Sequence, residues 1–236
     1  MASNYTPLDA LNFAKRFVMN MPLDDATIKI PILQAASDEL HLYAPWRWTI
    51  GEFEKKDIAN STEDYTISAV TDALFGLGAE LRFLEKERTE RLEFVANLTA
   101  VGIHTGTPRK IYWNGTTTLR LHPIPKGLEA TDLPKLISWY KLVNIRIQES
   151  GTETALVKND DNAAALRFGD EWFWVYRQLV LKHAYQFTSD PRLGSMQVDA
   201  RGGVALTGQM AVCEHLLRQM REKEKPLLFD IGEEVA

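Results

Sequence analysis

The chain has 236 residues, of which 45% are hydrophobic and 25% are charged, and its formal net charge is -5. This composition is typical of a soluble globular protein that can bury a core. The mildly acidic balance argues against a nucleic-acid-binding protein that relies on general phosphate neutralisation.

The chain begins with a predicted helix and then a second one. Thr6, Pro7 and Asp9 form a helix start, because Thr caps free backbone amides, Pro suits the first turn and an acid complements the dipole. Apolar residues at helical spacing extend this helix from Pro7 to about Asn20. The second helix runs up to Pro45, and Pro31 either kinks it or begins its regular part.

The middle of the chain is predicted to be rich in strands. Short runs of β-branched and aromatic residues indicate strands at 49–53, 65–70, 81–84 and 139–147. For residues 85–100, helix propensity slightly favours a helix over a long charged hairpin arm. Residues 108–121 form two alternating runs joined at Asn114-Gly115, which predicts a β-hairpin.

Two longer helical patterns close the chain. The first begins near Asn162 and reaches His183, the second runs from about Gln197 to Glu224, and a compact connection at 189–194 separates them. An apolar and then acidic tail, 226–236, follows the last helix, and such a tail usually docks on its own domain or on a neighbour.

These elements predict an α+β fold with a helical body and an inserted antiparallel β-rich domain. The body would comprise two N-terminal helices in residues 1–45 and two longer C-terminal helices in residues 159–225. The insertion would span residues 46–158, and residues 226–236 would form a docking tail.

Side chains that could carry chemistry are present but lack the spacing of known sites. No two of the five histidines stand at metal-ligand spacing on one predicted helix, although His183 and His215 lie on successive helices and could meet. Capping and solvation explain the carboxylate pairs at 24–25, 160–161 and 233–234. Cys213 is the single cysteine, which excludes an intrachain disulfide and suggests a small buried side chain. We therefore predict no catalytic residue, no metal and no cofactor.

Two groups of large side chains leave alternatives open. Trp172 and Trp174 flank Phe173, so a helix there carries aromatic rings on more than one side. Either the chain's own fold covers that helix or a neighbouring subunit does. A second group of residues is basic and fits either a channel lining that meets DNA or a solvated helix face: Arg177, Lys182, Arg192 and Arg201.

In its order of segments the chain resembles the head-to-tail adaptor, or connector, family of tailed bacteriophages. The entry helices lead to the aromatic cluster Pro45-Trp46-Arg47-Trp48, and the segment from Tyr65-Thr66-Ile67 leads to Asp72. Next come the run from Leu119 to Pro125, the strand opening at Trp139-Tyr140 and the closing helix pair. The resemblance covers nearly the whole chain, but the usual proline beside the acid is replaced here by Ser68-Ala69-Val70-Thr71.

The resemblance implies a structural protein without an enzymatic reaction. Such a chain forms a homo-oligomeric ring, commonly twelve-fold, beneath the portal protein, around the channel through which DNA passes without sequence-specific binding. A downstream neck or tail protein binds the other side, and the protein is found at the virion neck after assembly in the host cytoplasm. The tail residues Leu227, Leu228, Phe229 and Ile231 would then dock on the portal.

Three further expectations accompany this interpretation. One alternative is another neck component, such as a stopper or a tail-completion protein. A rival of another class is a small hydrolase that uses His122 or His183 with a nearby acid. No membrane association is expected, because no apolar run approaches the roughly 18 residues that a membrane span requires.

Overall fold

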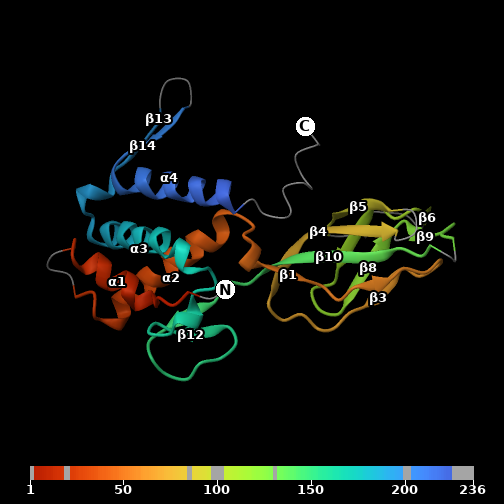
Figure 1. Ribbon diagram of the computed structural model, residues 1–236, viewed down its shortest axis with the longest axis horizontal. Coiled ribbons are helices and arrows are strands. Elements are labelled where there is room, and N and C mark those ends of the chain that lie inside the picture. Colours follow the sequence, from red (N-terminus) through yellow and green to blue (C-terminus); the bar gives the residue numbers. More distant parts are fainter. Residues whose placement is uncertain are drawn as a thin grey trace. The chain divides into compact units, whose positions relative to one another are not determined.

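The computed structural model describes residues 3–18, 22–83, 87–96, 104–129, 132–198 and 203–224. These residues divide into two compact units (Figure 1). Residues 3–49 and 144–224 form the terminal unit, which is made from both ends of the chain. Residues 50–143 form the central unit.

The terminal unit contains the long helices and two small sheets. Its helices are α1 (Pro7–Lys15), α2 (Ala26–Tyr43), α3 (Phe173–Thr188) and α4 (Gly208–Lys223). Strands β11 (Arg146–Gln148) and β12 (Val157–Asn159) pair in parallel, and β13 (Met196–Val198) and β14 (Val204–Leu206) pair antiparallel. Single 3₁₀ turns occupy Arg47–Thr49, Ala163–Ala165, Asp170–Trp172 and Pro191–Leu193. Helix α3 contacts α1, α2 and α4 and is therefore the centre of the unit.

The two N-terminal helices begin where the capping residues predict. Thr6 and Asp9 form a capping box at the start of α1, and this helix ends at Lys15, several residues before the predicted end. Asp25 caps α2 by accepting from the backbone N–H of Thr27 at 2.8 Å. Pro31 lies inside α2, so the helix continues past the proline rather than beginning there.

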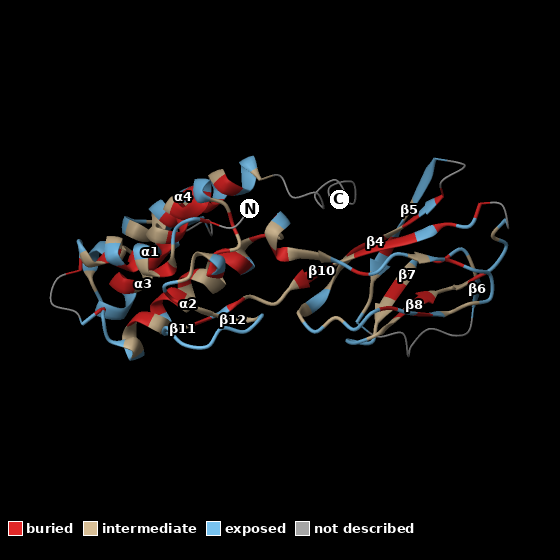
Figure 2. Cartoon of the chain, turned by 60° about the horizontal axis from the view of Figure 1, so that its bottom comes forward, coloured by how far each residue is buried: buried red, intermediate tan, exposed pale blue. Residues whose placement is uncertain are grey.

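The core of the terminal unit lies where the helices meet, as the buried colouring in Figure 2 shows. Trp46 is fully buried and its indole Nε1 donates to the carbonyl oxygen of Leu40 at 2.5 Å. Tyr176 is also fully buried, and its hydroxyl donates to the carbonyl oxygen of Leu33 at 3.1 Å. Both rings are therefore buried, and the polar atom of each donates a hydrogen bond to a backbone carbonyl oxygen of α2.

The central unit consists of strands. They are β1 (Ile50–Glu52), β2 (Lys56–Asp57), β3 (Asp64–Thr66), β4 (Ala73–Phe83), β5 (Arg88–Phe94), β6 (Thr105–Gly106), β7 (Lys110–Trp113), β8 (Thr118–His122), β9 (Ile124–Pro125) and β10 (Lys135–Leu142). Eight of them form one curled sheet in the order β1-β10-β4-β5-β7-β8-β3, with β2 also paired to β10. The pair β5–β7 is parallel and the other pairs are antiparallel, so the sheet is mixed. Strands β6 and β9 form a separate parallel pair.

An aromatic cluster fills the core of the central unit. Phe53 lies 4.5 Å from Tyr140, 5.3 Å from Trp113 and 6.3 Å from Phe94, measured between ring centroids. Gly76 permits this packing, because a Cβ atom there would approach the Phe94 ring to 2.3 Å. A glycine in strand β4 therefore provides space for an aromatic ring from strand β5.

The predicted fold class is wrong. About 35% of the described residues are helical and 29% lie in strands, and the largest assembly is the curled mixed sheet rather than a helical body. The sheet is also not antiparallel throughout, because the chain crosses over between β5 and β7 and these two strands run in parallel. The expected helix at 85–100 is likewise wrong, since residues 88–94 form β5 and pair with β4.

Other predicted elements are confirmed or shortened. The hairpin is confirmed as β7 and β8, although four residues, 114–117, connect the strands. The third helical pattern becomes the continuous helix α3 only from Phe173. The predicted helix from Gln197 is wrong over its first part, where β13 and β14 lie instead, and α4 begins at Gly208.

Candidate functional site

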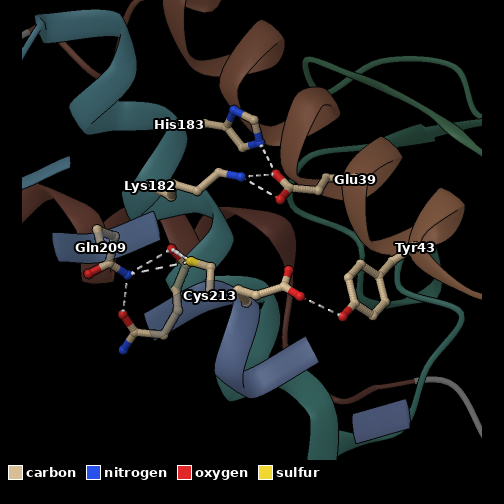
Figure 3. A network of polar contacts seen from close by, with 8 residues as sticks. Glu39, Tyr43, Lys182, His183, Gln209 and Cys213 are labelled. Atoms are coloured by element: carbon tan, nitrogen blue, oxygen red, sulfur yellow. Dashed lines mark hydrogen bonds and ion pairs between the residues drawn. The ribbon is translucent and has the colours of Figure 1, made fainter. Parts of the chain in front are cut away.

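Polar side chains from three helices meet in the terminal unit (Figure 3). We call this set the interhelical network: Glu39 and Tyr43 of α2, Gln178, Lys182 and His183 of α3, and Gln209, Cys213 and Glu214 of α4. At its centre the ammonium group of Lys182 donates to both carboxylate oxygens of Glu39. His183 Nε2 lies 2.7 Å from Glu39 Oε2. Two adjacent residues of α3 thus converge on one carboxylate of α2.

The ionisation of Glu39 reflects two opposing effects. Burial raises the pKa of this carboxyl, whereas hydrogen bonds from His183 and Lys182 lower it, and the balance places the pKa below its ordinary value of 4.5. The carboxylate is therefore charged at neutral pH and attracts the neighbouring ammonium group. This pairing ties α2 to α3.

A second part of the network ties α3 to α4. Gln209 Nε2 donates to the side-chain oxygen of Gln178 at 2.8 Å and to its backbone oxygen at 3.1 Å. The Cys213 thiol also donates to the backbone oxygen of Gln178, at 3.3 Å. Burial raises the pKa of this thiol to about 12. Cys213 is thus protonated at neutral pH and poorly suited to act as a nucleophile.

The network contains a histidine and an acid at the spacing of a general base and its orienting partner. Chemistry of the acyl-transfer kind also needs a nucleophile beside the imidazole, and the one thiol of the network is protonated and already donates to Gln178. Apart from the contact of Gln209 with Cys213 within α4, the other described contacts of the network join one helix to another. The arrangement is best suited to holding three helices in register.

The five histidines lie in four different surroundings. The His41 ring lies 6.1 Å from the Trp48 ring in the core, and His104 lies 6.0 Å from His122 in the central unit. His183 contacts Glu39 and His215 contacts Gln219, so the contact between His183 and His215 that the sequence left open does not occur among the described contacts. Across the described ranges, no three His, Cys, Asp or Glu side chains gather as a metal ion would require.

The described carboxylate pairs have structural roles. Asp24 forms an ion pair with Lys15, and Asp25 caps α2. Asp160 is buried and lies 2.9 Å from the ammonium nitrogen of Lys29, which also contacts Glu149. The third pair, 233–234, lies outside the described residues.

The three described basic candidates for a channel lining have partners within the chain. Lys182 pairs with Glu39, and Arg192 pairs with Asp190 at 2.7 Å. The guanidinium of Arg177 stacks over the ring of Phe13 at 4.7 Å. Arg201 lies outside the described residues. Of the two alternatives for these residues, the contacts within the chain give no support to a channel lining that meets DNA.

The aromatic residues around Phe173 are covered by the terminal unit itself. Trp172 and Phe173 are buried, and Trp174 is partly buried against the same core. The indole Nε1 of Trp172 donates to Glu224 Oε1 at 2.6 Å, which joins the start of α3 to the end of α4. Coverage by the chain's own fold therefore accounts for these rings.

Three of the exposed large apolar side chains in the described part of the chain lie together on the β13–β14 hairpin. Met196, Val198 and Val204 are 62%, 63% and 62% exposed. The hairpin extends away from the helices beyond α4 (Figure 1). A hollow of about 430 Å³ separates it from α4 and is lined by Met196, Val204, Leu206, Ala211, Glu214, His215 and Arg218. We call this feature the hairpin hollow.

The sequence also contains a turn signal for this hairpin, although the helical periodicity of the same residues predicts a helix. The β-branched Val198 and Val204 flank Gly202-Gly203, and a glycine pair between such residues is typical of a hairpin turn. The predicted portal-docking residues Leu227, Leu228, Phe229 and Ile231 lie outside the described part of the chain.

Comparison of the sequence with models of known protein families matches none of them, and comparison with curated proteins finds no significant similarity. Among the helices of the described residues, none combines the length and apolar character needed to cross a bilayer.

Proposed function

We propose that the protein is a structural assembly component, namely a ring-forming head-to-tail connector of a tailed phage. The observation that carries the proposal is the β13–β14 hairpin, on which the exposed apolar side chains of Met196, Val198 and Val204 lie together on one face. Uncovered apolar side chains that protrude from a packed unit are typical of surfaces that bind another protein. The order of sequence segments supports the choice of partner class.

In this proposal the protein acts by ordered docking rather than by a reaction. The ring would form beneath the portal, surround the DNA channel and present a surface to the next neck or tail protein. The apolar tail residues Leu227, Leu228, Phe229 and Ile231 would bind the portal.

The test is to mix the purified chain with the portal protein from the same genome and to measure mass by light scattering. We expect a complex of fixed stoichiometry. A chain that lacks residues 226–236 serves as the matched variant, and it should keep its circular dichroism spectrum but lose portal binding. A full chain that ignores the portal at every concentration contradicts the proposal.

The contact between His183 and Glu39 favours a second candidate, a small hydrolase. Its test is an ester-hydrolysis assay on the full chain and on His183→Gln, which keeps a polar side chain on α3. Turnover that disappears in the variant would support the hydrolase; equal background rates for both proteins would exclude a role for this pair.

A further inference from the structure

Two histidines of the central unit meet across separate segments of the chain. His104 directly precedes β6, His122 is the last residue of β8, and their ring centroids lie 6.0 Å apart at an interplanar angle of 71°. Neutral aromatic rings attract each other in this edge-to-face arrangement, because the positive edge of one ring meets the negative face of the other. His104 is exposed and His122 is partly buried, so protons from the solvent reach the pair.

The two rings lie beside the short parallel pair of β6 and β9. The N–H of Ile124 donates to the carbonyl oxygen of His104 at 2.8 Å, and the N–H of Lys126 donates to that of Gly106 at 3.1 Å. Each strand has two residues, and within the described residues neither strand pairs with any other. A two-stranded ladder of this length is marginally stable by itself. The ring contact is therefore well placed to decide whether segments 104–106 and 122–126 stay together, and we call this contact the histidine clasp.

Cations outnumber acids next to the histidine clasp. Lys110 of β7 is the direct cross-strand partner of His122, so these two side chains share one face of the sheet. Arg109 is exposed, and its N–H donates to the carbonyl oxygen of His122 at 2.9 Å, while the exposed Lys126 follows β9. None of these three cations has an ion-pair partner among the described residues. The nearest unpaired acid is Glu93 of β5, which is the cross-strand partner of Lys110 and lies one strand farther from the histidine.

The other acids on this face are already paired. Glu63 and Asp64 form ion pairs with Arg120 of β8 at 3.3 Å and 2.6 Å. The cross-strand partner of Arg120 on β7 is Tyr112, which adds no acid. Residues 97–103, which lead to the clasp, contain no charged residue. Positive charge that appears on the two rings is therefore poorly compensated.

We propose that the histidine clasp is a pH-sensitive contact that opens in mildly acidic solution. Histidine is the residue type whose charge changes between about pH 5 and pH 8. One proton is tolerated, because a charged imidazolium still attracts the face of a neutral ring. A second proton places like charges on rings whose centroids are 6.0 Å apart, beside Lys110 and Arg109. At an effective dielectric constant of about 40, the Coulomb repulsion at this separation shifts an equilibrium about tenfold. The inference goes beyond the proposed function, because it concerns one segment of the central unit and requires no partner.

The test is amide hydrogen exchange of the full-length chain, followed by NMR at about pH 7.5 and about pH 5, the range over which histidine changes its charge. A chelator is present, so that no metal ion bridges the rings. Protection factors correct for the intrinsic effect of pH on exchange. They are compared at the two clasp amides, Ile124 and Lys126, and at a reference amide in the same unit, Ile67, whose N–H donates to the carbonyl oxygen of Thr117 at 2.8 Å.

We expect the protection of the clasp amides, relative to the reference amide, to fall about tenfold at the lower pH. In His104→Gln and in His122→Gln the fall should be less than twofold, because each variant keeps a polar side chain but has only one ring to charge. The matched control His215→Gln changes an exposed histidine of the terminal unit and should behave like the native chain. An undiminished fall in the two clasp variants, or constant protection in the native chain, overturns the inference.

A second measurement needs no variant. The ring C–H resonances of His104 and His122 are followed through a pH titration of the native chain. Coupled rings take up their protons in two separated steps, and the resonances of both rings should report both steps. Two independent single-step curves would show that the rings do not interact, and the clasp would then be wrong even if a variant failed to fold.

Discussion

In the interhelical network, charged and polar side chains are covered and paired, whereas on the β13–β14 hairpin apolar side chains are exposed. The ammonium group of Lys182 and the ring of His183 both reach Glu39, while Val198 on the hairpin is 63% exposed. A buried charge without a partner is costly, so pairing inside the unit indicates a structural role. Exposed apolar side chains on a protruding hairpin contribute little to folding, so binding to another protein is the role that we infer for them. The following variants separate these two roles.

The largest effect is expected from Glu39→Ala. This change leaves the ammonium group of Lys182, whose side chain is 15% exposed, without its carboxylate partner. Because the pair is only partly buried, with Glu39 28% exposed, we expect the free energy of unfolding to fall by roughly 2–3 kcal/mol, between the values for an exposed pair and a fully buried one. Urea denaturation monitored by circular dichroism measures it. A fall below about 0.5 kcal/mol, as for an exposed pair, would contradict a structural role for the network.

The next effect concerns the base of the hairpin. Gly194→Ala places a Cβ atom 2.0 Å from the carbonyl oxygen of Thr207 at a φ of 87°, and we expect a local cost of about 2 kcal/mol. Gly115→Ala is the matched control, because its φ is 86° and nothing lies within 4 Å, so only the backbone penalty of about 1 kcal/mol remains. Hydrogen exchange measures each cost locally, at β13 and β14 for Gly194→Ala and at β7 and β8 for Gly115→Ala. Equal protection in Gly194→Ala and the native chain would show that the base is not crowded.

A third effect is the dependence of stability on pH. The pKa of Glu39 is lower in the folded chain than its ordinary value of 4.5, so the folded state holds fewer protons there than the unfolded state. The contribution of Glu39 is fully present above pH 4.5 and is lost as the pH falls through the folded pKa. Thermal melts between pH 6 and pH 3, recorded for the native chain and for Glu39→Gln, should converge at the acid end. Parallel curves over the whole range would exclude Glu39 as a source of the dependence.

The smallest effect on folding is expected from Val198→Asn. The side chain is largely exposed, so the free energy of unfolding should change by no more than about 0.5 kcal/mol. Association with the portal protein, measured by light scattering, should nevertheless weaken at least fivefold if the exposed face of the hairpin takes part in assembly. Gln197→Asn, on the opposite side of the hairpin, should leave association unchanged. Equal association of both variants would place the contact elsewhere.

The sequence predicted local features better than long-range pairing. Capping at Thr6 and the β7–β8 hairpin around Asn114-Gly115 depend on residues close together in the chain, and both predictions are confirmed. The helix expected at 85–100 failed because its propensity is overridden by pairing of β5 with β4. The curled sheet joins β10 to β1 and β4, which are distant in sequence, and no local pattern specifies such neighbours.

The candidate site was only partly predictable. His183 was singled out as a histidine with a possible acid nearby, but its partner Glu39 lies 144 positions away and carries no motif. The helical periodicity across Val198 and Val204 predicts one helix, whereas the glycine pair between them predicts a turn. The structure has the two strands β13 and β14 there. Contacts that form only through tertiary packing therefore could not be predicted from the sequence, whereas turns could be predicted from their residue types.

The division of the chain into two units has a consequence for its synthesis. Residues 50–143 leave the ribosome as one uninterrupted stretch, so the curled sheet can fold before α3 is synthesised. Helices α1 and α2 are made before the sheet, yet the face they pack against belongs to α3, more than a hundred residues downstream. During translation the apolar sides of these two helices therefore stay uncovered by α3 until the sheet between them in the sequence has been synthesised.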